Sequence, residues 1–229
     1  SFGNVFAKKE QERVYSLFKE FLMLFILIAF SMSFTFLIGI RGFISVWVGK
    51  DNYILSYLTI VLFTSTLFLN ILYYPLVALI NADGLFKDNK KHIFICALTN
   101  LVSSIILINF FGIKGILFGT AISFLLNILL KSNLVAKKIL KDIKLISVLK
   151  YYIITIVLFI VLALVLEPIE LYFLNNSTGF ITTILKLGII FVLVTMITSG
   201  VLYFVSNDAK NLFSRIIGLI KRKLKVKEN

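Results

Sequence analysis

Residues 21–40 read FLMLFILIAFSMSFTFLIGI and carry no charged side chain. The hydrocarbon core of a bilayer is about 30 Å thick, and a helix needs about 20 apolar residues to cross it. Five further apolar segments follow along the chain, at 53–82, 93–113, 115–130, 151–166 and 180–205. Water-soluble domains do not repeat such segments six times, so we expect an all-α integral membrane protein, a bundle of six transmembrane helices.

The composition agrees with one membrane domain. Hydrophobic residues make up 59% of the chain and the mean hydropathy is +1.00, above the roughly 45–50% apolar content of soluble domains. The 229 residues include only two prolines and 12 glycines, too few for a linker. We therefore expect an amphipathic cytoplasmic helix at 1–20, the six-helix membrane unit at 21–205 and a basic amphipathic cytoplasmic tail at 206–229.

The net charge of +13 is distributed unevenly along the chain. Most of the 24 Lys and Arg residues fall in the N-terminal flank, in the second and fourth connections and in the tail. Cytoplasmic loops of membrane proteins carry such an excess, so the alternation predicts that both termini face the cytoplasm. Orientation and attraction to anionic membrane lipids explain the positive charge, and we expect no nucleic-acid partner.

Both polar flanks have an apolar face at helical spacing. In the N-terminal flank this face comprises Val14, Leu17 and Phe18. In the tail, Asn207 or Asp208 is expected to cap a helix with apolar residues on one face and lysines on the other. Both helices are predicted to lie on the membrane surface as anchors, with binding of a partner protein as the alternative.

No catalytic or metal-binding pattern is visible in the sequence. The single histidine, His92, has no second histidine or cysteine at ligand spacing, and the single cysteine, Cys96, falls inside an apolar segment. Glu167 and Glu170 flank the start of a connection beside Pro168, where we expect them to be solvated. The sequence therefore predicts no enzyme activity, no metal and no cofactor.

Mild polar residues within the spans follow helical spacing, and we treat them as candidates for lining a substrate cavity. Polar groups in hydrocarbon need partners, so they face protein or water. They either form interhelical hydrogen bonds or line a hydrated cavity that contacts sugar hydroxyls. The candidates are Ser56, Thr59, Thr66, Asn70 and Tyr73 in the second segment, and Asn127 in the fourth.

Two basic residues near the outer ends of spans have two interpretations each. Lys186 is the one charge inside the sixth segment, and Arg41 follows the first. A long basic side chain there can extend to the interface. The alternative is a contact with an anion, such as a lipid-linked pyrophosphate, inside a cavity.

Backbone features predict a bend and a tight contact. The second segment is too long for a straight crossing, and Pro75 removes a backbone donor, so we expect a kink near residues 73–75, either a static bend or a hinge. The third and fourth segments are joined by a short turn at residues 112–115 and should form a hairpin. Gly115 and Gly119 then form a small-xxx-small face for close helix contact.

Several stretches together resemble one family of transporters. They are residues 1–4 (SFGN), 10–21 (EQERVYSLFKEF), 43–49 (FISVWVG), 81–87 (NADGLFK) and 112–120 (GIKGILFGT), with Asn100 between the last two. Their order and spacing resemble the polysaccharide (O-antigen and capsule) flippases of the multidrug, oligosaccharidyl-lipid and polysaccharide exporter superfamily. The sequence departs from the family at Gly42, where a proline usually stands.

The resemblance implies a specific architecture and activity. The chain would be the C-terminal lobe of a two-lobe transporter, with an N-terminal lobe as its partner, in the bacterial cytoplasmic membrane. The family translocates undecaprenyl-pyrophosphate-linked oligosaccharide by alternating access between lobes. Arg41 and Lys186 are the cationic candidates for the cavity in this half. A multidrug antiporter of the same fold, a non-transporting membrane scaffold and a membrane-embedded acyltransferase are the alternatives.

Overall fold

The computed structural model describes residues 11–49 and 55–227, with side chains up to residue 218. Within these residues all regular elements are helices, and six helical segments are long and apolar enough to cross a membrane. The predicted fold class, an all-α membrane bundle with six spans, is confirmed.

The helices follow the predicted segments but are longer. The spans are α2 (Gln11–Val48), α3 (Tyr57–Leu72) with α4 (Tyr74–Ala82), α5 (Phe86–Phe111), α6 (Ile113–Leu134) extended by the π-turn η2 (Val135–Ile139), α7 (Leu145–Val165) and α9 (Phe180–Val205). Two further helices, α8 (Glu167–Asn175) and α10 (Asn207–Lys227), complete the chain.

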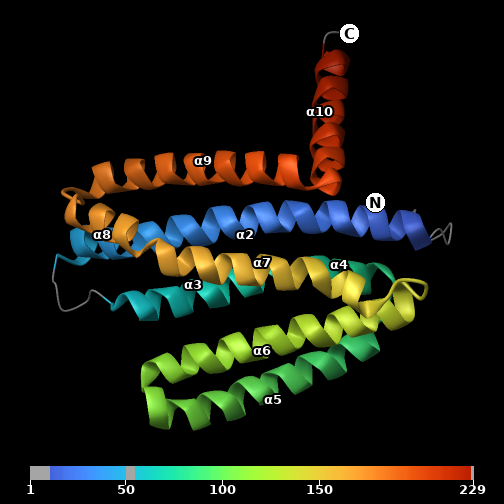
Figure 1. Ribbon diagram of the computed structural model, residues 1–229, viewed down its shortest axis with the longest axis horizontal. Helices are drawn as coiled ribbons and strands as arrows, with labels where there is room; N and C mark the ends of the chain where they lie inside the picture. Colours follow the sequence, from blue (N-terminus) through green and yellow to red (C-terminus); the bar gives the residue numbers. More distant parts are fainter. Residues whose placement is uncertain (1–10, 50–54, 228–229) are drawn as a thin grey trace.

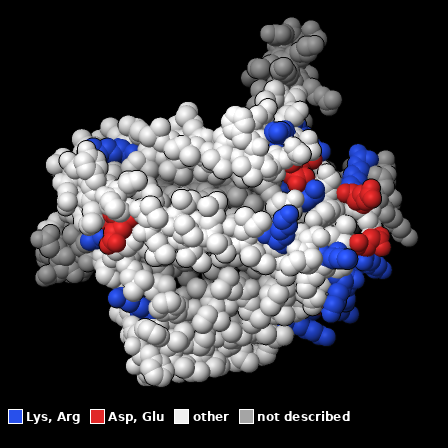
Figure 2. All heavy atoms as spheres, viewed as in Figure 1, with Lys and Arg blue, Asp and Glu red and all other residues white. Residues whose placement is uncertain are grey.

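The spans lie side by side along one direction (Figure 1). The α5–α6 hairpin forms one flank of the bundle and α9 the other, with α2, α3 and α7 between them. We call the end that holds the start of α2 and the end of η2 the basic end, because Lys and Arg gather there (Figure 2). On the face that Figure 2 shows, the surface between the two ends carries few charged residues. The connections that are rich in Lys and Arg thus lie at one end of the bundle, and those with few basic residues lie at the other.

Residues 11–20 differ from the expectation of a separate surface helix. They form the first turns of α2, which continues without a break for 38 residues. Val14 and Phe18 are buried in the bundle instead of facing a membrane surface. Because residues 11–38 include no glycine or proline, nothing ends the helix at residue 20. The remainder of the predicted helix, residues 1–10, lies outside the described residues.

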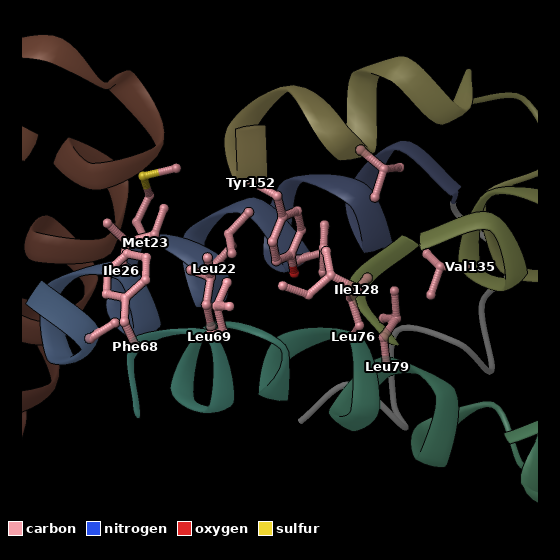
Figure 3. Packing of buried hydrophobic residues seen from close by; sticks show 14 of the residues in the cluster. Leu22, Met23, Ile26, Phe68, Leu69, Leu76, Leu79, Ile128, Val135 and Tyr152 are labelled. Atoms are coloured by element: carbon pink, nitrogen blue, oxygen red, sulfur yellow. The ribbon is translucent and has the colours of Figure 1, made fainter. Parts of the chain in front are cut away.

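Aromatic side chains dominate the core between α2, α3 and α7. The Phe68 and Phe159 rings stack with centroids 4.1 Å apart, and Phe30 and Phe34 contact this pair from α2. Toward the basic end, Tyr152 of α7 packs among Leu22, Leu69 and Leu76 (Figure 3). Offset or tilted aromatic pairs add about 0.5–1.5 kcal/mol each beyond burial. This core fixes α2, α3 and α7 against one another.

The predicted interruption near Pro75 is present. α3 ends at Leu72 and α4 begins at Tyr74, with Pro75 in the first turn of α4. Proline lacks the N–H that a continuous helix would need there, whereas the first turn of a new helix tolerates it. The hinge role of Pro75 stays a prediction.

At the basic end, α10 follows α9 and projects away from the bundle, across the direction of the spans (Figure 1). The N–H of Ala209 donates to Ser206 Oγ at 3.3 Å, so Ser206 caps the helix and not the predicted Asn207 or Asp208. Asp208 instead pairs with Lys19 of α2 at 2.9 Å, and Arg215 pairs with Glu20 at 3.2 Å. These contacts fix the start of the tail helix against α2.

A polar pocket at the junction of α4, α5 and α6

One polar cavity in the described part of the chain gathers two of the predicted residues. It encloses about 350 Å³ between the α3–α4 break and the α5–α6 hairpin. The lining residues are Tyr73, Val77, Asn89, Ile93, Cys96, Ala97, Asn100, Thr120, Ser123, Phe124, Asn127 and Lys131. We call it the α4–α6 pocket. Tyr73 and Asn127 line it, whereas Arg41, Ser56, Thr59, Thr66, Asn70 and Lys186 do not.

Lys131 is the charged residue of this pocket. It was expected in a connection between spans, but α6 continues to Leu134 and is extended by η2, which places Lys131 inside the helix. Its side chain is 1% exposed. The Nζ atom donates to Asn89 Oδ1 at 2.7 Å and lies 6.0 Å from the centre of the Tyr73 ring. No carboxylate of the described residues forms an ion pair with it.

Asn127 lies one helical turn before Lys131 on the same face of α6. Its Oδ1 atom is buried and has no hydrogen-bond partner among the described residues. Tyr73 faces the pocket from the α3–α4 break, and its ring stacks on Tyr74 and Phe124. The pocket thus combines one buried ammonium, an amide with unused hydrogen-bonding capacity and aromatic walls.

Several polar residues of α5 and α6 hold the hairpin together. Ser123 Oγ donates to the Cys96 carbonyl at 2.7 Å, and Thr120 Oγ1 and Ser104 Oγ approach Asn100 Oδ1 at 3.4 and 3.1 Å. A Cβ atom at Gly119 would lie 2.7 Å from the backbone nitrogen of Ser104. The predicted hairpin and its close glycine contact are confirmed, and hydrogen bonding within and between the two helices accounts for these side chains.

The candidates of the second span other than Tyr73 lie outside the α4–α6 pocket, and three of them form hydrogen bonds within their own segment. Ser56 and Thr59 share a hydrogen bond of 2.8 Å at the end of the bundle opposite the basic end. Thr66 Oγ1 donates to the Phe63 carbonyl of its own helix at 2.7 Å. Asn70 is half-buried on α3, outside the α4–α6 pocket.

Arg41 and Glu170 form an ion pair that corrects one expectation. Glu170 was expected to be solvated, but its side chain is fully buried, with Oε2 2.8 Å from Nη1 of Arg41. The unpredicted helix α8 lies against the end of α2 (Figure 1). Glu170 belongs to its buried side. Burial raises the pKa of the Glu170 carboxyl above its ordinary value, and the Arg41 charge opposes the shift.

Lys186 follows the first of its two interpretations. Its Nζ atom donates to the backbone carbonyl of Asn176 at 2.7 Å, in the connection between α8 and α9. The side chain therefore extends toward the end of the span and satisfies a carbonyl there. Lys186 and Lys131 therefore lie near opposite ends of the bundle.

An apolar cleft of about 240 Å³ runs beside α2, between α7 and α9. Side chains from all three helices line it, among them Phe34, Leu158 and Val194. Together with the exposed apolar residues of α5 and α9, it presents hydrocarbon surface that a bilayer would cover.

Comparisons with models of protein families, with curated proteins and with solved structures give no match to this chain. The site residues that the sequence analysis missed are Lys131 and Asn89. A signal for Lys131 was present, since it continues the polar face of Thr120, Ser123 and Asn127 by one more turn. A charged residue after an apolar segment, however, commonly marks the end of a span, and this pattern predicts that Lys131 lies in a connection.

Proposed function

We propose that this chain is one lobe of a flippase that moves undecaprenyl-pyrophosphate-linked oligosaccharide across the bacterial cytoplasmic membrane. The observation that carries the proposal is the α4–α6 pocket, a polar cavity with a buried ammonium inside an apolar helical bundle. A lipid-linked oligosaccharide presents the matching groups, because hydroxyls need amide and aromatic partners and a pyrophosphate needs a cation.

The motifs at 43–49, 81–87 and 112–120 support the same family, and the six-span bundle has the size of one lobe. Ile93 and Ala97 line the pocket and are exposed on the outer side of α5. Substrate headgroups would enter between helices from the bilayer, while the polyprenyl chain stays in lipid. In this proposal an N-terminal lobe completes the transporter and alternates with this one.

The proposal also includes orientation. The basic end faces the cytoplasm, with both termini on that side. α10 then lies along the inner membrane surface, where its basic sequence favours contact with anionic lipid headgroups.

The antiporter alternative needs a titratable carboxylate that exchanges ions within a span. Among the described residues, the buried carboxylates Glu20 and Glu170 are each paired with an arginine. This pairing leaves neither of the two carboxylates free to exchange ions. No observation on the described residues favours a scaffold or an acyltransferase over transport.

The test is export by the protein produced from its complete gene, in bacteria that lack their own polysaccharide flippase. Asn127→Leu removes pocket polarity and should reduce surface polysaccharide at least tenfold with unchanged protein level. The matched control is Asn109→Leu, because Asn109 is exposed and bonds only the Ile105 carbonyl of its own helix. Equal export by both variants would refute the proposal.

A further inference from the structure

Lys131 is an unusual buried charge. Removing an ammonium from water costs several kcal/mol even after relaxation, and proteins normally offset this cost with a carboxylate. Here the oxygen that Lys131 contacts, Asn89 Oδ1, is neutral. An ammonium carries three N–H donors, and that bond uses one of them. An ammonium at this position therefore has N–H donors that Asn89 does not satisfy.

The surroundings of Lys131 define where a counter-anion would sit. The α4–α6 pocket adjoins the ammonium, and Asn127, one turn earlier on α6, has unused hydrogen-bonding capacity. An amide can rotate to present its NH₂ group, so Asn127 can donate to an anion that Lys131 attracts. The Tyr73 ring closes the site on the side of the α3–α4 break.

The exposed residues at the edge of the pocket indicate whether the anion enters from the bilayer or from water. Ile93 is 54% exposed and lies one turn after Asn89 on α5, beside the strongly exposed Phe94. These side chains belong to the lipid-facing surface of a span whose most apolar stretch is almost entirely unburied. An apolar entrance suits a ligand that carries a hydrocarbon chain next to its charge.

We infer that Lys131, with Asn127, binds the phosphoryl headgroup of a membrane lipid that enters the α4–α6 pocket between the helices. The lysine acts as a point charge on the phosphoryl oxygens, and the lipid chain lies along the exposed face of α5. Basic pockets between spans near the cytoplasmic side are typical headgroup sites. The inference rests on the proposed function for the identity of the lipid, namely the pyrophosphate carrier.

The test measures binding without transport, so its failure is distinguishable from failure of the proposed function. The detergent-solubilised protein is titrated with farnesyl pyrophosphate, and the Tm shift gives an apparent Kd. Farnesol, with the same chain and no charge, should give no shift. Inorganic pyrophosphate should bind at least tenfold more weakly. Equal binding of inorganic pyrophosphate would overturn the lipid assignment, and equal shifts with farnesol would overturn the anion site.

Lys131→Met should weaken farnesyl pyrophosphate binding at least tenfold, because it keeps the volume and removes the charge. The matched control is Lys137→Met, the same change at an exposed lysine of η2, and it should leave the Kd within twofold. The ligand-free Tm of Lys131→Met should equal or exceed that of the wild type, since an uncompensated charge is gone. Unchanged binding by Lys131→Met would overturn the inference.

A second variant covers the case in which Lys131→Met does not fold. Asn127→Asp places a carboxylate one turn from Lys131 as an internal counter-ion. It should raise the ligand-free Tm and weaken farnesyl pyrophosphate binding at least tenfold. Wild-type affinity in Asn127→Asp would contradict a headgroup site at Lys131.

Discussion

At the scale of single residues, two basic side chains near opposite ends of the bundle, Lys131 and Arg41, have different kinds of partner. Near the basic end Lys131 meets neutral oxygen, while at the opposite end Arg41 meets the carboxylate of Glu170. A buried ion pair contributes little net stability, but removal of one partner leaves an uncompensated charge. The two sites therefore respond in opposite directions to loss of the basic side chain.

Arg41→Met should destabilise the protein by about 3 kcal/mol at pH 8, because Glu170 is left buried without its partner. The effect should shrink toward pH 5. Burial raises the folded-state pKa of Glu170 above its ordinary value. Stability therefore falls as the pH rises from the ordinary pKa through the raised folded-state pKa. Loss of Arg41 raises this pKa further, because the opposing positive charge is gone. Thermal unfolding in detergent at several pH values measures this.

The double variant Arg41→Met/Glu170→Gln is the control, because it removes the carboxyl group that titrates. Its loss of Tm relative to the wild type should show much less pH dependence. A loss in Arg41→Met that is independent of pH would contradict the buried pair as the source of the effect.

At the scale of elements, backbone approach decides how α5 and α6 pack. Hydrocarbon offers no hydrophobic driving force between helices, so their association depends on close packing and on hydrogen bonds. Gly115 and Gly119 allow Leu107 and Ser104 of α5 to reach the backbone of α6. The same closeness places Asn89 of α5 beside Lys131 of α6 and so builds the α4–α6 pocket.

Gly119→Ala should lower the stability of the chain by about 1–3 kcal/mol, because its Cβ would overlap the backbone of Ser104. Gly188→Ala is the matched control on α9, where no atom lies within 4 Å of the added Cβ. Alanine favours a helix over glycine by up to about 1 kcal/mol, so this control should be neutral or stabilising. The Tm of each variant is measured in the same detergent as the wild type. Equal Tm shifts in Gly119→Ala and Gly188→Ala would contradict the close packing at Gly119.

At the scale of the whole molecule, charge and apolar surface are arranged for a bilayer. The outer helices α5 and α9 expose most of their apolar side chains, and Lys and Arg concentrate at the basic end (Figure 2). The proposed orientation places the α7 start and the η2 end inside the cell and the α8–α9 connection outside.

Cysteine labelling in whole cells tests this orientation. In a Cys96→Ala background, Thr178→Cys should react with a membrane-impermeant maleimide in intact cells, whereas Lys141→Cys should react only after permeabilisation. Both positions are exposed in the structure. The reverse pattern would show that the basic end faces outward.

The spans, their number and the bend at Pro75 follow from the sequence, because apolar length and a missing backbone donor act locally. The hairpin of α5 and α6 follows from its short turn and its glycines for the same reason. Helix ends were less predictable: α2 and α6 continue past the first charged residues, since a charged side chain can stay helical when the bundle supplies a partner. Two of the eight cavity candidates, Tyr73 and Asn127, reach the α4–α6 pocket, and sequence spacing places each only on a face of its own helix.

The contacts of the buried charged side chains depend on the packing of segments that are distant in the chain. Asn89 and Lys131 are 42 residues apart, and Arg41 and Glu170 are 129 apart. Which polar group meets which depends on the angle and depth at which two helices cross, and these depend on the fit of the whole bundle. The hydropathy of each segment determines whether its helix lies in lipid or in water. The packing between helices determines which group each buried charged side chain contacts.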